Sequence, residues 1–313
     1  MKLLEAAVNI SEGRDDRFLA DIEAACGETF LDLHADPDHH RSVVTVAGPQ
    51  DAVEAAVRRI AVEAISQLDI RRHSGVHPRF GVIDIVPFVP LTFQDHQRTP
   101  VEEPSREGAP VEHSLTHLDA TPSLDGACTV RDRFARWAST TLTLPCFLFG
   151  PLGHGEDRIL PEVRRNAFRV LQPDTGPRSP HPTAGACAVG ARNFLIAYNV
   201  WVRPMDLTRA RSIASAVRGP AVRALAFKFG PESDAVQISC NLIDPFAVGP
   251  ADVRDRIARI AATMGSAVSS CELVGLIPAG VLASISTTRW EELGLEPAST
   301  IEARLEQRGI AMD

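Results

Sequence analysis

The chain has 313 residues, more than one hydrophobic core usually supports, because single cores stop growing at roughly 250 to 300 residues. Apolar residues make up 44% and charged residues 23%, and no apolar run reaches the roughly 18 residues that a membrane span needs. The net charge of −8 and the single tyrosine argue against a nucleic-acid surface. We therefore expect a soluble protein of two subdomains that binds small molecules and neither nucleic acid nor membrane.

The cysteines are widely spaced, with no CxxC pair and no zinc-binding spacing. They are Cys26, Cys128, Cys146, Cys187, Cys240 and Cys271. This pattern predicts neither a disulfide framework nor a structural metal. The first residues, MKLLEAAVNISEG, meet an acid before any long apolar segment develops, so we expect no signal peptide. Together these features favour a cytoplasmic location.

Strand and helix patterns alternate in the first half. Runs rich in apolar or β-branched residues predict strands at residues 3–8, 29–33, 42–47 and 82–86. From residue 51 the apolar residues recur at helical spacing, which predicts an amphipathic helix. Asp51 and Glu54 have the spacing of a capping box at its start.

The second half repeats this alternation. The same patterns predict strands at 194–200, 222–229 and 235–240, and helices at 207–217 and after Gly249 and Pro250. Two such halves, each with helices on one face of a sheet, indicate an α+β fold. We expect two ferredoxin-like α/β sandwich subdomains related by duplication.

Two stretches interrupt the regular patterns. Residues 91–127 are rich in Pro, Glu, Ser, Thr and His without a period, and we interpret them as a mobile insertion that could act as a lid. Residues 172–190 are dense in Pro and Gly, and a ligand cleft could form there. We therefore divide the chain into an N-terminal subdomain of residues 1–180 and a C-terminal subdomain of residues 181–313.

His77 is the first candidate for chemistry. It lies in RRHSGVHPRFG, where Pro78 forces an extended backbone at His77. Nearby arginines, among them Arg79, would attract an anion and would disfavour a second proton on the imidazole. A neutral ring near pH 7 can act as a base. The alternative is a surface-loop histidine beside solvated arginines.

The second candidate is the polar run HADPDHHR at residues 34–41. Its spacing matches no familiar zinc site, so we expect no metal there. Its carboxylates would suit a cationic substrate. The alternative is a polar turn whose aspartates accept hydrogen bonds from their own backbone.

The third candidate is the glycine-rich run at residues 173–192. Its glycines let backbone N–H groups approach a flat or anionic ligand, and His181 and Arg192 could contact carboxylates. Neither GxxxxGK[ST] nor a strand-linked GxGxxG is present, which argues against the usual nucleotide loops. A plain interdomain linker would have a similar composition.

Six stretches, in order along nearly the whole chain, resemble the glutamate formimidoyltransferase family. They are VNISEGRD (8–15), DPDHHRSVVTVAG (36–48), HSGVHPRFGVIDIVPF (73–88), PDTGPRSPHPTAGACAVGARNFLIAYN (173–199), SCNLID (239–244) and ELVGLIP (272–278). The resemblance implies a homodimer of two-subdomain chains, with tetrahydrofolate as co-substrate in a tunnel between the sheets. It implies transfer of a formimidoyl group from N-formimidoyl-L-glutamate to N5 of tetrahydrofolate, in histidine degradation and one-carbon metabolism.

The resemblance also assigns residues. His77 matches the catalytic histidine, which would act as general base and then as general acid. The matching folate-binding segment comprises Gly176, Pro177, Arg178, Ser179, Pro180, His181, Pro182, Thr183, Ala184 and Gly185. For the substrate, Asp36 is a candidate for holding the cationic amidine. The candidates for binding the carboxylates are Arg41, Arg79 and Arg192.

Two positions depart from the family pattern. His40 stands where family members usually have Asn, and the stretch 160–168 lacks their Gly-Glu pair. A paralogue that uses another amine donor or acceptor is therefore an alternative. Two others are a non-catalytic folate-binding protein and a metal-dependent amidohydrolase.

Overall fold

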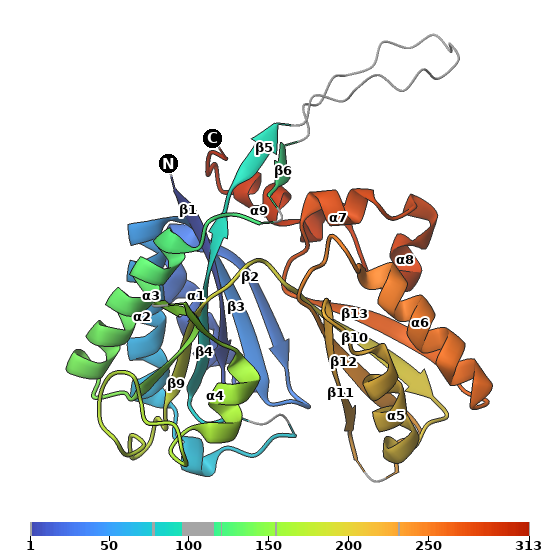
Figure 1. Ribbon diagram of the computed structural model, residues 1–313, viewed down its shortest axis with the longest axis horizontal. Helices are drawn as coiled ribbons and strands as arrows, with labels where there is room; N and C mark the ends of the chain where they lie inside the picture. The colour runs from blue at the N-terminus through green and yellow to red at the C-terminus, as the bar shows by residue number, and fades with distance from the viewer. Residues whose placement is uncertain are drawn as a thin grey trace.

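The chain folds into two α/β units that lie side by side (Figure 1). The computed structural model describes residues 2–76, 79–95, 116–119, 121–153, 155–230 and 232–312. The first unit begins with β1 (Leu3–Ile10), α1 (Asp16–Cys26), β2 (Phe30–Asp36), β3 (Arg41–Pro49), α2 (Gln50–Gln67) and β4 (Ile83–Leu91). Its strands are antiparallel and lie in the order β2-β3-β1-β4. The strands and the helix predicted for this part are confirmed.

The second unit repeats the same succession of elements. It comprises β10 (Ile196–Arg203), α5 (Leu207–Val217), β11 (Val222–Lys228), β12 (Val236–Leu242), α6 (Pro250–Thr263) and β13 (Ala267–Val274). Its antiparallel strands lie in the order β11-β12-β10-β13, which matches the order in the first unit. The predicted pair of ferredoxin-like units is confirmed.

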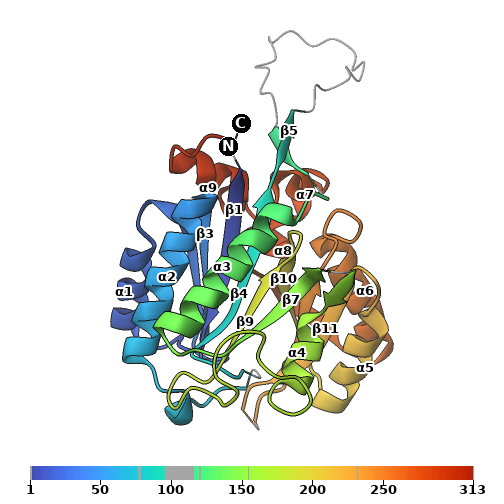
Figure 2. The same cartoon turned by 60° about the vertical axis from the view of Figure 1, so that its left-hand side comes forward.

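Three further strands extend the first sheet beyond β4. They are β9 (Cys187–Ala191), β7 (Cys146–Gly153) and β8 (Glu156–Arg158). β9 runs parallel to both β4 and β7. Its residues come after residue 180, where we predicted the boundary between the subdomains, yet it belongs to the first sheet. Helices α1, α2 and α3 (Asp125–Thr141) lie along the outer face of this sheet (Figure 2). α4 (Leu160–Asn166) packs with Phe147 and Phe149 of β7 in a separate apolar cluster.

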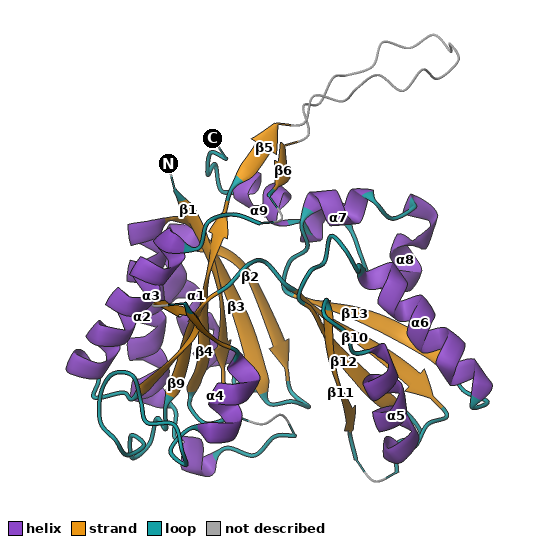
Figure 3. Ribbon diagram, viewed as in Figure 1, coloured by secondary structure: helices purple, strands orange, loops and turns teal. Residues whose placement is uncertain are grey.

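Short elements complete the described chain (Figure 3). The hairpin strands β5 (Phe93–Asp95) and β6 (Thr116–Leu118) pair with each other. The remaining short helices are η1 (Gly27–Thr29), η2 (Ile70–Arg72), α7 (Ala279–Ala283), η3 (Thr287–Arg289), α8 (Trp290–Leu293), η4 (Pro297–Ser299) and α9 (Ile301–Gln307). Among the described residues, no helix is long and apolar enough to cross a bilayer.

Two details of the prediction were wrong. The aperiodic stretch 91–127 contains regular structure at both ends, since β5 follows at Phe93 and α3 begins at Asp125. Its interior, residues 96–115, lies outside the described residues, and so does the lid that we placed there. The capping box also fails, because the N-cap of α2 is Pro49 and the buried Glu54 pairs instead with Arg58 and Arg133.

Apolar packing joins the two units. One core lies between the first sheet and helices α1 to α3. The other lies between the second sheet and helices α5 and α6, and it continues to Leu3, Leu31 and Val89 of the first unit. Because buried side chains from both units share this second core, the two sheets are held in a fixed relation.

Two backbone segments distant in sequence touch beside β4. Gly81 forms an antiparallel bridge with Gly185, and the N–H of Val82 donates to the carbonyl oxygen of Ala184 at 3.0 Å. A Cβ atom on Gly81 would lie 1.8 Å from the carbonyl oxygen of Ala186. Only glycine permits this approach, so Gly81 fixes where residues 79–82 meet residues 184–186.

We predict that Gly81→Ala lowers the free energy of unfolding by about 1–3 kcal/mol or more, because the new methyl group overlaps a buried carbonyl group. Urea unfolding measures the change. Gly219→Ala is the matched control, since its Cβ would meet no atom within 4 Å. Its expected change is within about 0.5 kcal/mol. Equal stabilities for the two variants would contradict the close contact.

Candidate functional site

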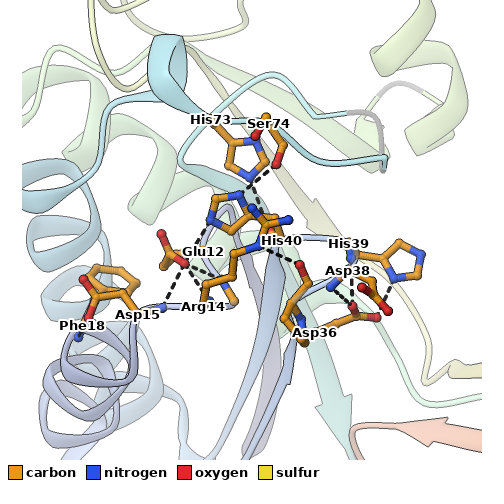
Figure 4. Close-up of polar contacts among 12 residues, drawn as sticks. Glu12, Arg14, Asp15, Phe18, Asp36, Asp38, His39, His40, His73 and Ser74 are labelled. Carbon is orange, nitrogen blue, oxygen red and sulfur yellow. Dashed lines mark hydrogen bonds and ion pairs between the residues drawn. The ribbon is translucent and has the colours of Figure 1, made fainter. Parts of the chain in front are cut away.

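The polar cluster shown in Figure 4 forms where three connections of the first unit meet. The loop between β1 and α1 supplies Glu12, the end of β2 supplies Asp36, and the turn between β2 and β3 supplies His39 and His40. The segment between η2 and β4 supplies His73. These residues span 61 positions of the sequence, and the sheet order brings them together.

Asp36 organises the β2–β3 turn. One carboxylate oxygen accepts the backbone N–H groups of Asp38 at 2.9 Å and His39 at 2.8 Å, and the other lies 2.5 Å from Nδ1 of His39. Burial opposes ionisation, but these hydrogen bonds lower the pKa of Asp36 to about 2. Asp36 is therefore a carboxylate near neutral pH, within the kind of polar turn that we gave as an alternative.

His39 connects the turn to the second unit. Its side chain is 4% exposed, and its ring meets the rings of Phe227 and Phe229 edge-on, with centroids 5.3 and 4.8 Å away. Phe227 belongs to β11. Because Asp36 holds the other side of the ring, His39 acts as a polar side chain anchored across the boundary between the units.

His40 turns toward the opposite side of the cluster. Its Nε2 lies 3.0 Å from a carboxylate oxygen of Glu12, and its Nδ1 lies 2.9 Å from the carbonyl oxygen of Ser74. The same Glu12 oxygen accepts the N–H groups of Gly13, Arg14 and Asp15. Burial favours neutral Glu12, but these bonds and the charge of His40 leave its pKa below the ordinary value.

Arg79 holds the backbone of the turn. Its two terminal nitrogens donate to the carbonyl oxygens of His40 and His39, both at 2.6 Å, and Nη1 also lies 2.5 Å from Nε2 of His73. The same nitrogen of His73 lies 2.8 Å from the carbonyl oxygen of His40, so His73 and Arg79 meet at that oxygen. Burial lowers the pKa of His73, which favours a neutral ring.

Arg41, Arg79 and Arg164 surround the buried Asp84. Asp84 is 2% exposed, accepts the N–H of Phe80 at 2.9 Å and pairs with Arg164 of α4. Burial lowers the pKa of Arg41, and burial also lowers that of Arg79 to about 10, while Asp84 is the largest charge that favours both cations. The predicted Arg41 and Arg79 thus lie in one electrostatic cluster.

Hydrogen bonds anchor the segment 176–185 near both of its ends, to α3 at one end and beside residues 79–82 at the other. At its start, the hydroxyl of Thr175 donates to the carbonyl oxygen of Ala135 in α3. At its end, His181 and Gly185 exchange two backbone hydrogen bonds, and Nδ1 of His181 accepts the N–H of Ala184 at 3.0 Å. Arg178, Ser179, Pro180 and Pro182 are exposed between these anchors.

Arg192 has a different electrostatic environment. Burial lowers its pKa to about 10, and Glu5 is the charge that opposes this shift. Burial likewise raises the pKa of Glu5 to about 7. The guanidinium group of Arg192 also donates to the carbonyl oxygen of Asn193 at 2.8 Å. The acid that balances Arg192 thus comes from β1 and not from the cluster around Asp84.

One predicted residue lies outside the described part of the chain, and three residues of the cluster were not predicted. His77 lies outside the described residues, between Val76 and Arg79. Glu12, Asp84 and Arg164 were not predicted, although Asp84 is an acid inside an apolar strand, which is a usable signal. In the part of the chain that the structure describes, no three His, Cys, Asp or Glu side chains gather as a metal site would require.

Comparisons with known proteins find similar chains over most of this sequence. The N-terminal subdomain of the formiminotransferase domain matches residues 3–192. Glutamate formimidoyltransferase of Thermoplasma acidophilum is 32% identical over 98% of both chains. The enzyme of the same name from Streptococcus pyogenes serotype M1 is 28% identical over 91% of this chain and 92% of its own.

Formimidoyltransferase-cyclodeaminase of Sus scrofa is also similar, at 28% identity over 88% of this chain but only 50% of its own length. The domain match covers more than half of the chain, and the Thermoplasma relative aligns from end to end. The chain therefore belongs to the formiminotransferase family of enzymes.

Proposed function

We propose that the protein transfers a formimidoyl group from N-formimidoyl-L-glutamate to N5 of tetrahydrofolate, in histidine degradation and one-carbon metabolism. The observation that carries this proposal is the bridge between Gly81 and Gly185. It joins the segment that contains His77 to the segment 176–185, which the family resemblance assigns to folate. Relatives named glutamate formimidoyltransferase support the choice of donor.

The proposed reaction needs one proton carrier. The lone pair of N5 attacks the amidinium carbon, a new C–N bond forms, and His77 accepts the proton that N5 loses. The resulting imidazolium donates this proton to the glutamate nitrogen as the old C–N bond breaks. The products are 5-formimidoyltetrahydrofolate and glutamate, and His77 returns to its neutral form. General acid–base help of this kind contributes about 10² to 10⁴ in rate.

The charges of the described residues fit these substrates. Asp36 is a carboxylate at neutral pH and is the candidate for holding the cationic amidine. Arg41 and Arg79 are candidates for the carboxylates of glutamate, since guanidinium groups bind such groups with two parallel hydrogen bonds. In this proposal Arg192, which lies beside Glu5, contacts a more distant carboxylate of folate.

The function is tested by mixing purified protein with tetrahydrofolate and either formimidoylglutamate or formimidoylglycine. We expect 5-formimidoyltetrahydrofolate to form with the glutamate donor, and absorbance spectroscopy with mass spectrometry identifies the product. Transfer from the glycine donor alone would identify a paralogue. Tight folate binding without transfer from either donor would identify a non-catalytic folate-binding protein.

We predict that His77→Ala lowers kcat by about 10² to 10⁴ while tetrahydrofolate still binds, because only the proton carrier is lost. Isothermal titration calorimetry measures the binding and stopped assays measure kcat. Val76→Ala is the matched control, because Val76 precedes His77 and is 45% exposed. It should change kcat by less than about twofold. Near-normal turnover of His77→Ala would disprove the proton transfer.

Metal removal gives a separate prediction. The proposed reaction uses no metal, so dialysis against EDTA should leave kcat unchanged within about twofold, and added Zn²⁺ or Mn²⁺ should not raise it. Elemental analysis of the dialysed protein provides the control. Loss of activity that added metal restores would favour the metal-dependent amidohydrolase.

We also propose a homodimeric, cytoplasmic protein, as the family resemblance implies. Light scattering after size-exclusion chromatography measures the oligomeric state. A mass near that of one chain at micromolar concentration would contradict the dimer.

A further inference from the structure

Both described ends of the segment that contains His77 are fixed to the His39–His40 turn. On the N-terminal side, His40 Nδ1 lies 2.9 Å from the carbonyl oxygen of Ser74, and a Cβ on Gly75 would lie 2.5 Å from the carbonyl oxygen of His39. On the C-terminal side, Arg79 donates to the carbonyl oxygens of both histidines. The turn therefore holds residues 74–75 and residue 79 at once.

His40 makes the side-chain part of this connection with both ring nitrogens. One nitrogen faces the Glu12 carboxylate at 3.0 Å and the other faces the Ser74 carbonyl at 2.9 Å. Both partners only accept hydrogen bonds, so both contacts are complete only when each nitrogen has a hydrogen. The geometry thus fits the imidazolium form of His40, paired with the ionised Glu12.

The surroundings of His40 contain four further ionisable groups. The ring of the neutral His73 stacks on it with centroids 4.2 Å apart and an interplanar angle of 26°. Arg79 binds the backbone of His40, and Arg14 donates from the β1–α1 loop to Pro37 of the same turn. Asp36 in that turn is already bound to His39. Glu12 is therefore the carboxylate that pairs with the His40 ring.

The backbone of His40 is also specialised. Its φ of 51° lies in the left-handed region, which is uncommon for residues other than Gly, although Asn, Asp and His adopt it more often than most. In this conformation the ring is directed toward Glu12 and Ser74 (Figure 4). Its carbonyl oxygen accepts a hydrogen bond from Arg79.

We propose that His40 is a positioning residue, whose imidazolium form links Glu12 to Ser74 and thereby orients the segment of His77 for proton transfer. This inference rests on the proposed function, because the oriented group is His77. The link is charge-assisted at its Glu12 end, and such bonds are about twice as strong as neutral ones. Removing it takes away the link to Ser74, so the N-terminal end keeps only the contact of His73 Nε2 with the carbonyl oxygen of residue 40 at 2.8 Å, while Arg79 still holds the other end.

The test is His40→Gly, which suits the left-handed backbone and leaves a ring-sized gap beside Glu12, Ser74 and His73. We expect kcat to fall about tenfold to a hundredfold while the KM for tetrahydrofolate changes less. Free imidazole should restore activity by filling the gap. His40→Asn, which also tolerates this backbone but cannot bridge both partners, should show the same loss of kcat.

The pH dependence of the rescue distinguishes positioning from base catalysis. For His40→Gly, the rate with imidazole divided by the rate of the same variant without it should be larger at about pH 6 than at about pH 8, because imidazole is mostly protonated below about pH 6.5. For His77→Gly, the same ratio should rise with pH, because a base must be neutral. A ratio for His40→Gly that also rises with pH would overturn the positioning role.

Hydrogen–deuterium exchange tests the link without using turnover. In His40→Gly, amides of residues 73–76 should exchange faster than in the wild type, and imidazole should slow them again. Arg71→Ala is the matched control, since it removes only the exposed ion pair with Asp69 just before this segment. Its exchange at residues 73–76 and its kcat should match the wild type.

The outcomes separate the two proposals. If the wild-type protein transfers no formimidoyl group, the proposed function fails, and the exchange experiment alone decides whether His40 fixes the segment. If transfer occurs but both His40 variants keep kcat within about twofold of the wild type, the positioning role is wrong. Unchanged exchange at residues 73–76 in folded His40→Gly would also overturn it.

Discussion

The guanidinium group of Arg79 and the carbonyl oxygens of His39 and His40 form the interaction on which the site depends. Two hydrogen bonds of 2.6 Å fix the turn to the segment that follows His77. The side chains of this turn then diverge, since His39 enters the second unit and His40 meets Glu12. Such an arrangement lets one short turn set the relative positions of three loops and two units.

The charges of the site differ from those of the whole chain. The protein has a net charge of −8, yet three arginines gather around a single buried acid, Asp84. Each of these arginines has partners within the protein, so the cluster is a preorganised set of dipoles and charges. Near neutral pH the carboxylates of Asp36 and Glu12 lie beside it, which gives the site both signs of charge.

Much of the fold could be predicted from local patterns, because β-branched runs and helical spacing are properties of short windows. The repeat of strand and helix in the two halves likewise predicted the duplicated architecture, which the two matching strand orders confirm. α3 was missed because the polar and proline-rich residues before it hide its start at Asp125. Glu54 looked like a cap, but Arg58 and Arg133 compete for its carboxylate.

The candidate site was predictable only where a motif marks it. Arg41 and Arg79, which come from two separate candidate segments, share one electrostatic cluster, whereas Arg192 pairs electrostatically with Glu5 in β1. Asp84 and Arg164 are 80 positions apart, and only the packing of α4 against the sheet reveals that they meet. No local pattern contains such a contact, and His77 itself stays a prediction from the resemblance.

The edge-on contacts of His39 with Phe227 and Phe229 have a mechanical consequence. A displacement of the second unit relative to the first would either break the contacts of the His39 ring with the two phenyl rings or move the His39–His40 turn, because Asp36 binds the ring from the other side. The strain would pass directly to Arg79 and His40 through one peptide unit. The position of the polar turn in the first unit therefore depends on the position of β11 in the second unit.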